Sequence, residues 1–101
     1  MTRITPTITV SDKTSDVFLL SGDLVYSTVP DFVKKGESLF VKGSNKIVVD
    51  CSAVKHIDSA GLSLLLEWKR VCQKFHKECL YESLPAQAAK LIETFKLQAL
   101  I

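Results

Sequence analysis

Residues 47–68, IVVDCSAVKHIDSAGLSLLLEW, decide the fold that the rest of the chain has to complete. The stretch Lys46–Cys51 is rich in β-branched residues and predicts a strand that is apolar on both faces. Such a strand belongs at the centre of a sheet, covered on at least one side by helices. Residues 52–58 predict a loop, and a helix is expected from Ser59 to about Phe75.

Two strands and a helix are predicted before this stretch. The segments Thr7–Val10 and Val17–Leu20 are short and β-rich, and the polar turn Ser11–Asp16 between them predicts a hairpin. A helix is expected to start near Ser27 or Thr28, because either hydroxyl can cap it and Pro30 suits a first turn. An imperfect apolar stripe continues this helix to Phe40, although Gly36 weakens its middle.

A strand and a helix are predicted after it. Glu78–Glu82 has the composition of a strand, and Ser83-Leu84-Pro85 opens a last helix that runs to about Phe95. The element order is therefore β-β-α-β-α-β-α. It predicts one α/β domain over residues 1–101, with a small mixed sheet of about four strands and about three helices packed mainly on one face. Right-handed crossovers make the strands after the hairpin parallel.

The composition limits the classes of function. The 101 residues are 47% hydrophobic and 24% charged, with a net charge of +2, as in an ordinary globular domain. The lysines are scattered, which argues against nucleic-acid binding. The three cysteines show no paired spacing and are expected to be buried and reduced. We see no signal peptide, and the apolar runs are far shorter than the roughly 20 residues of a membrane helix. We therefore expect a cytoplasmic protein that meets a membrane only indirectly, through a partner.

The start of the helix after the central strand is the first candidate site. Asp58 or Ser59 can accept hydrogen bonds from the free N–H groups of the first turn. A helix N-terminus also favours an anion, including a phosphate if Ser59 were phosphorylated. Ala60 and Gly61 are small, which leaves the Ser59 hydroxyl approachable. The plainer interpretation is that this dipeptide is an ordinary helix cap.

Helical periodicity divides the rest of this helix into faces. The arc predicted to face the core comprises Gly61, Leu64, Leu65, Trp68, Val71, Cys72 and Phe75. The positions predicted to face solvent are Ser63, Glu67, Arg70 and Lys74. Leu62 and Leu66 belong to neither set and project from the flank near Lys69. They complete a predicted partner-binding patch made of Ser59, Ala60, Leu62, Leu66 and Lys69. The alternative is that both leucines tuck under a neighbouring helix or loop.

Catalysis is not expected. His56 lies three residues before Ser59, but no G-x-S-x-G elbow surrounds this serine. The other histidine, His76, falls near the far end of the helix. The sequence contains no metal-binding cluster, P-loop or dinucleotide fingerprint, so we predict no catalytic residue, no metal and no cofactor.

The motif Asp58-Ser59-Ala60-Gly61-Leu62, after a strand ending in Asp50, resembles the STAS domains of anti-sigma-factor antagonists. That family keeps D-[ST]-x-G-[LI], and a partner kinase phosphorylates its serine or threonine. The resemblance implies the STAS fold over nearly the whole chain. Antagonists often carry an acidic residue after G-x-L, where this chain has Val25; Asp23 is the acid that could replace it.

Two longer stretches resemble one branch of the family, the MlaB subunits of Gram-negative phospholipid transport systems. They are residues 20–30, LSGDLVYSTVP, and residues 58–68, DSAGLSLLLEW. This resemblance implies a non-enzymatic subunit that binds an MlaF-like ABC ATPase in a complex with an MlaE-like permease, peripheral to the inner membrane, and supports the maintenance of outer-membrane lipid asymmetry. It also implies that Ser59 marks the contact end of the helix. The alternative is an anti-sigma-factor antagonist regulated by phosphorylation of Ser59.

Overall fold

The computed structural model describes residues 3–10 and 17–101, and its elements follow the predicted order. The elements are β1 (Thr7–Val10), β2 (Val17–Leu24), α1 (Val33–Lys42), β3 (Lys46–Ile57), α2 (Ser59–Lys74), β4 (Glu78–Glu82), α3 (Ala86–Thr94) and the short 3₁₀ helix η1 (Gln98–Leu100). The turn predicted over residues 11–16 lies outside the described residues.

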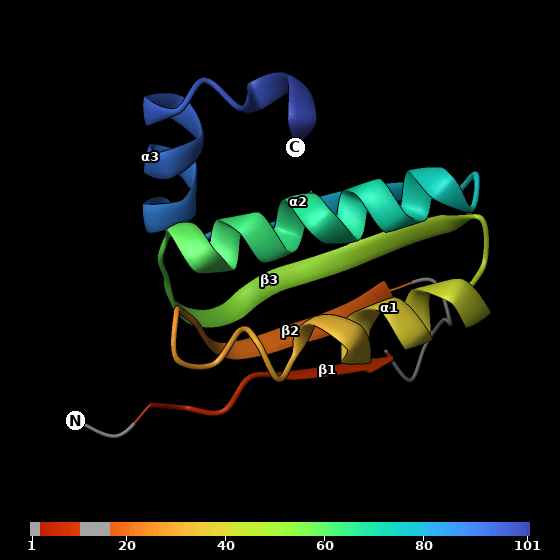
Figure 1. The fold of residues 1–101 in the computed structure, drawn as a ribbon, viewed down its shortest axis with the longest axis horizontal. Coiled ribbons are helices and arrows are strands. Elements are labelled where there is room, and N and C mark those ends of the chain that lie inside the picture. The colour runs from red at the N-terminus through yellow and green to blue at the C-terminus, as the bar shows by residue number, and fades with distance from the viewer. Residues whose placement is uncertain (1–2, 11–16) are drawn as a thin grey trace.

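The four strands form one mixed sheet in the order β1-β2-β3-β4 (Figure 1). β1 and β2 pair antiparallel as the predicted hairpin, with Thr9 opposite Leu19. β3 pairs parallel with β2 on one side and with β4 on the other. The strand that contains Ile47 and Val49 therefore occupies an inner position in the sheet, as its apolar sequence predicts.

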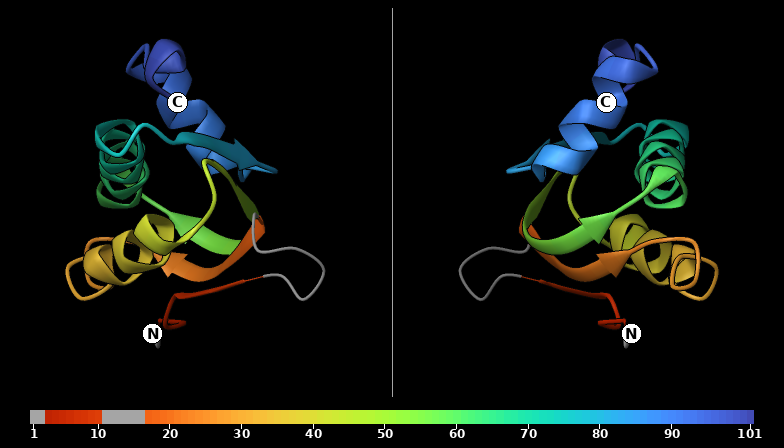
Figure 2. Two further views of the ribbon diagram at one scale, coloured as in Figure 1. Left: turned by 90° about the vertical axis from the view of Figure 1, so that its right-hand side faces the viewer. Right: turned by 90° about the vertical axis from the view of Figure 1, so that its left-hand side faces the viewer.

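Helices α1 and α2 cover one face of this sheet (Figure 2). Alternate side chains of the strands face them and are buried, including Phe18 and Leu20 of β2 and Val49 of β3. Leu19, which points to the other face, is 44% exposed. α3 packs against α2 and β3, beside the end of the central strand. The predicted layering, with the helices mainly on one face, is confirmed.

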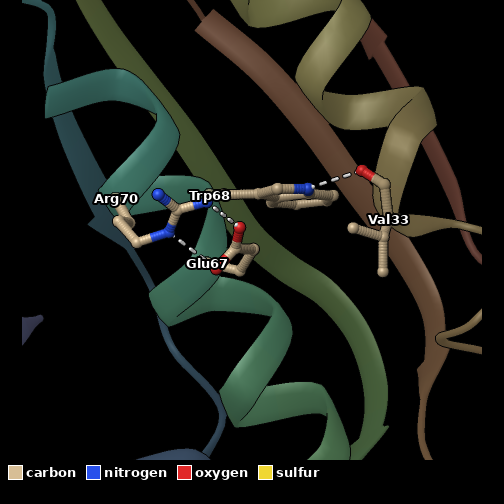
Figure 3. A network of polar contacts seen from close by, with 4 residues as sticks. All are labelled: Val33, Glu67, Trp68 and Arg70. Carbon is tan, nitrogen blue, oxygen red and sulfur yellow. Dashed lines mark hydrogen bonds and ion pairs between the residues drawn. The ribbon is translucent and has the colours of Figure 1, made fainter. Parts of the chain in front are cut away.

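Trp68 joins the two covering helices. Its indole Nε1 donates a hydrogen bond to the Val33 carbonyl at 2.9 Å, across the space between α2 and α1 (Figure 3). The Phe32 and Phe40 rings lie 5.7 and 5.1 Å from the Trp68 ring. A Cβ at Gly36 would lie 2.3 Å from the same ring, so α1 approaches Trp68 at a position where only glycine fits. Gly36 is thus a packing site as well as a weak point in helix propensity.

The predicted start of the first helix is wrong by about five residues. α1 begins at Val33, and residues 25–32 form turns instead. The Thr28 hydroxyl does not cap a helix. It accepts from the Val25 N–H at 3.1 Å and donates to the Asp23 carbonyl at 2.6 Å, which holds the turn closed.

The predicted loop over residues 52–58 is also wrong, because β3 continues to Ile57. β2 is also longer than predicted, because it continues to Leu24. The two extensions pair with each other: Ala53 lies opposite Ser21 and Ile57 opposite Leu24. Side-chain alternation is irregular here because the register shifts twice along the pair. As a result, Asp58 follows directly on the end of a strand.

The core face of α2 is largely as predicted. The buried residues of the predicted arc are Gly61, Leu64, Leu65, Trp68, Val71 and Cys72. Phe75 is the exception and is 47% exposed, because the helix ends at Lys74 and Phe75 follows as its C-cap. All three cysteines are free and buried, as predicted. Burial raises the pKa of the Cys51 thiol to about 12.

Candidate protein-binding site

The Asp58 side chain caps α2. Its Oδ1 accepts hydrogen bonds from the N–H groups of Ala60 at 2.9 Å and Gly61 at 3.1 Å. Its Oδ2 accepts from the Tyr26 N–H at 3.0 Å, which ties the turn after β2 to the start of the helix. The Ser59 side chain takes no part in this cap and is exposed. Of the two residues that could have capped the helix, Asp58 does so, and the Ser59 hydroxyl faces outward.

Gly61 fixes the position of this helix end against the sheet. A Cβ at Gly61 would lie 2.1 Å from the Leu24 carbonyl oxygen and 2.7 Å from the Ile57 side chain. The Asp58 N–H donates to the same Leu24 oxygen at 3.2 Å. Glycine is therefore needed at position 61 so that the helix can pack against the end of β2. From the sequence, Gly61 was expected only to leave the Ser59 hydroxyl approachable, and this packing role was not predicted.

Ser59 borders a groove between the start of α2 and α3. The groove has a volume of about 490 Å³. It is lined by Ile57, Asp58, Ser59, Gln87, Lys90, Leu91, Thr94 and Phe95. Gln87 is fastened to the sheet because its Oε1 accepts a hydrogen bond from the Ile57 N–H at 3.2 Å. Phe95 is 57% exposed, and so the groove offers apolar surface beside the serine.

A second exposed aromatic lies at the same end of the molecule. Tyr26, whose N–H is held by Asp58, is 81% exposed. The sequence analysis missed Tyr26 and the α3 side of the groove. A signal was present in α3: Ala88 and Ile92 form one apolar pair at helical spacing and are buried. Leu91 and Phe95 form a second apolar pair at helical spacing, and this pair is not buried in the core.

The predicted patch is not one continuous surface. Leu62 is only 3% exposed, so the expectation that it projects from the flank is wrong. Leu66 and Lys69 are half-buried, and they line a small pocket together with Leu100 from the end of the chain. The Lys69 ammonium donates a hydrogen bond to the main-chain oxygen of Ile101.

Leu66 and Lys69 are covered in part by the C-terminal residues Leu100 and Ile101. α3 contacts α2, and the segment after α3 returns along α2 (Figure 1). This segment therefore packs on the flank of α2 that helical periodicity assigns neither to the core nor to solvent. The alternative, in which a neighbouring part of the chain covers these leucines, is correct for Leu62 and partly correct for Leu66.

The polar groups near Ser59 do not form a catalytic set among the residues that the structure describes. No hydrogen bond joins Ser59 to His56 or His76, and both histidines are exposed. Asp23 is buried, and its Oδ2 accepts from the Ile4 N–H at 2.9 Å. Its Oδ1 has no hydrogen-bond partner within the described part of the chain. Asp23, the residue that could replace the acidic residue of the antagonists, is thus hydrogen-bonded to the N-terminal segment.

Within the same residues, no group of histidine, cysteine and acidic side chains is arranged to hold a metal ion. None of the helices in the described ranges is both long and apolar enough to cross a bilayer.

Comparison with known families assigns this architecture. The family model described as "Mlab, STAS domain" matches residues 9–101, which is nearly the whole chain. The chain belongs to the STAS domain family. STAS domains are typically regulatory or interaction modules rather than enzymes. No curated protein sequence is similar enough to count as a match.

Solved structures of STAS proteins share the fold. The unphosphorylated anti-sigma factor antagonist SpoIIAA is 15% identical, with a TM-score of 0.69 over 93% of this chain and 84% of that one. An anti-sigma factor antagonist from Mycobacterium paratuberculosis is 20% identical, with a TM-score of 0.68 over 95% and 80% of the two chains. A sulfate transporter family protein from Wolinella succinogenes is 17% identical, with a TM-score of 0.67 over 92% and 75%. At these identities the likeness concerns the fold alone.

Proposed function

We propose that this STAS domain is a non-enzymatic, MlaB-like subunit that binds the cytoplasmic ABC ATPase of a phospholipid transport complex. In this proposal the ATPase is MlaF-like, the complex contains an MlaE-like permease, and the domain supports its assembly or activity in maintaining outer-membrane lipid asymmetry. The protein would lie in the cytoplasm, peripheral to the inner membrane through its partner. The description of the matching family model supports this assignment.

The observation that carries the proposal is the exposed Ser59 side chain at the start of α2, outside the cap that Asp58 makes. A residue that the fold does not need for capping is available to a partner. The exposed aromatic rings of Tyr26 and Phe95 lie at the same end. Aromatic side chains are enriched in protein interfaces, where they contribute a large share of the binding energy.

An antagonist regulated by phosphorylation of Ser59 is the second candidate. The likeness to SpoIIAA, whose phosphorylated form also matches at a TM-score of 0.66, favours it. Against it, Asp23 is buried and bound to Ile4, so it does not supply an acid beside Ser59.

Affinity capture of the tagged protein from its native cells, followed by mass spectrometry, distinguishes the two functions. The transport function predicts recovery of an ABC ATPase and its permease, with Ser59 unmodified. Recovery of a kinase-like anti-sigma factor, with part of the captured protein phosphorylated at Ser59, would replace this proposal with the antagonist function.

A further inference from the structure

Cys72 of α2 and Cys79 of β4 are buried in the same hydrophobic core. We propose that they form a peroxide-sensitive thiol pair, which hydrogen peroxide converts into a reversible disulfide that joins α2 to β4. The inference goes beyond the proposed function and is independent of it, because it concerns a chemical modification of the domain itself.

The turn after α2 brings the chain back against Cys72. The Lys77 N–H donates to the Cys72 carbonyl at 2.8 Å, and the His76 N–H donates to the Gln73 carbonyl at 3.0 Å. His76 has a left-handed φ of 58°. These features form a Schellman motif, which reverses the chain at the end of a helix. β4 begins immediately after Lys77, so Cys79 lies two residues beyond the residue that is bonded to Cys72.

The side chains of Cys72 and Cys79 point toward each other. Tyr81 follows Cys79 by two residues, so both side chains lie on one face of β4. That face is turned toward α2, because the Tyr81 hydroxyl donates to the Leu65 carbonyl at 2.6 Å. Leu65 and Cys72 are both on the buried face of α2, about two helical turns apart. β4 runs back along α2, and this places the Cys79 thiol beside the Cys72 thiol.

Cys72 is the more easily ionised thiol of the pair. A hydrogen bond with Cys79 lowers the pKa of Cys72 in spite of burial, and the positive charges of Lys77 and Lys69 lower it further. Both ammonium groups are held in place by hydrogen bonds to main-chain oxygens. The same contact between the thiols, together with burial, raises the pKa of Cys79, which therefore remains the protonated partner.

A small pocket leads from the surface to the pair. It has a volume of about 240 Å³ and is lined by Lys69, Gln73, Lys77, Glu78, Cys79 and Leu80. A water molecule takes up about 30 Å³ in the liquid, so a molecule as small as hydrogen peroxide fits this pocket. Cys51 differs from the pair, because burial raises the pKa of its thiol to about 12 and keeps it protonated near neutral pH.

The proposed reaction is a two-electron oxidation with hydrogen peroxide as the oxidant. The Cys72 thiolate attacks one peroxide oxygen, so that an S–O bond forms and the O–O bond breaks. The other oxygen leaves as hydroxide and becomes water with the proton that the thiol released. The Cys79 sulfur then attacks the sulfenic acid sulfur, the S–S bond forms, and hydroxide leaves with the Cys79 proton as a second water. The two sulfurs lose two electrons, and the two peroxide oxygens gain them.

The disulfide protects the core from permanent damage. Without a second thiol, a sulfenic acid is oxidised further to sulfinic and sulfonic acids, which are not restored by thiol reductants. Either acid would place an unpaired charge among the buried side chains around Cys72, at a large cost in stability. The disulfide adds no oxygen to the core, and a dithiol or glutathione returns it to two thiols.

Peptide mapping of the purified domain tests the proposal and needs no ATPase. Trypsin cuts after Lys74 and Lys77, so that Cys72 falls in peptide 71–74 and Cys79 in peptide 78–90. After exposure to hydrogen peroxide and alkylation of the remaining thiols in denaturant, we expect these two peptides to be joined. The intact protein should have lost two hydrogen atoms, and dithiothreitol should restore both thiols. Peptide 47–55, which contains Cys51, should carry the alkyl group.

Two variants sharpen the test. Cys79→Ala removes the second thiol, so this form should gain oxygen at Cys72 and form no disulfide within the chain. Cys51→Ala is the matched control at another buried cysteine and should form the same disulfide as the native protein. Circular dichroism shows whether each variant is folded, and the mapping of the native protein stands without them.

Three results for the native protein would overturn the inference. The first is that peptides 71–74 and 78–90 stay separate while either gains oxygen. The second is a disulfide that involves Cys51 or joins two chains. The third is that Cys72 and Cys79 both stay reduced at peroxide concentrations that oxidise free cysteine. Each result leaves the proposed function as it stands, because the binding of an ATPase does not depend on this pair.

Discussion

Asp58 and Ser59 are neighbours with separate tasks. The two carboxylate oxygens of Asp58 accept hydrogen bonds from three backbone N–H groups, two in α2 and one at Tyr26. Ser59 contributes only its main chain, whose carbonyl accepts from the Ser63 hydroxyl at 2.9 Å. The fold therefore depends on Asp58, and a partner can use Ser59 without disturbing the cap.

Replacing Asp58 by alanine should destabilise the domain. The variant leaves the first-turn N–H groups and the Tyr26 N–H without their acceptor, and loss of a helix cap costs about 1–2 kcal/mol. Urea denaturation measures the change in the free energy of unfolding. Asp31→Ala is the control, because this exposed aspartate accepts no hydrogen bond from the described residues; it should change stability by less than about 0.5 kcal/mol. Equal stability of the two variants would contradict the assigned cap.

Replacing Ser59 by aspartate should weaken partner binding without loss of stability. A carboxylate at the first position of α2 is favourable for the helix dipole, but a partner would have to desolvate it. We expect an affinity loss of about tenfold or more in a titration with the ABC ATPase. Ser63→Asp, one helical turn further on, should have a smaller effect. Undiminished affinity of the Ser59→Asp form would place the contact elsewhere.

At the scale of elements, the strand and helix types could be predicted and several boundaries could not. The apolar run at 46–51 shows a central strand, and Asp-Ser before an amphipathic pattern shows where α2 begins. The extension of β3 through Ile57 depends on pairing with Ser21–Leu24, a partner about 30 residues away that no local pattern reveals. The start of α1 was missed because Thr28 closes a turn with Asp23 instead of capping a helix.

Only part of the candidate site could be predicted, because local features can be read from the sequence and contacts between distant elements cannot. The sequence motif locates Ser59 at a helix start because capping is local. Helical periodicity places Leu62 on the flank, but Leu62 is buried once the helices and the sheet pack together. The groove with Lys90 and Phe95 is missed altogether, since it exists only after α3 packs beside the end of β3.

Gly36→Ala tests the contact between α1 and α2. Helix propensity alone predicts that alanine stabilises the middle of α1 by about 1 kcal/mol. The structure predicts the reverse, because the new Cβ would lie 2.3 Å from the Trp68 ring and force apart the helices that this ring joins. We expect a loss of about 1–3 kcal/mol in the free energy of unfolding, measured by urea denaturation. A more stable variant would show that α1 does not approach Trp68 this closely.

For the molecule as a whole, stability should fall at alkaline pH. Burial, with the Asp50 charge adding to it, raises the pKa of Cys51 to about 12, and burial also raises the pKa of Tyr81. These groups keep their protons in the folded state while the unfolded chain releases them. The stability they provide is therefore complete below a cysteine's ordinary pKa of 9 and is lost as pH rises toward 12.

Urea denaturation at about pH 8 and about pH 10.5 measures this fall, which should be on the order of 1 kcal/mol or more. Cys51→Ala removes one of the responsible groups, so its stability should decline less between the two pH values than that of the native protein. An equal decline in both proteins would show that the Cys51 thiol titrates normally in the fold.

The central claim is that this STAS domain works by binding the ATPase of a lipid-transporting ABC complex. A calorimetric titration of the purified domain with the purified ATPase subunit tests it most directly. The account predicts saturable binding with a dissociation constant in the micromolar range or tighter, as expected for a specific subunit contact. No binding to the ATPase, together with tight binding of an anti-sigma kinase that phosphorylates Ser59, would contradict the account.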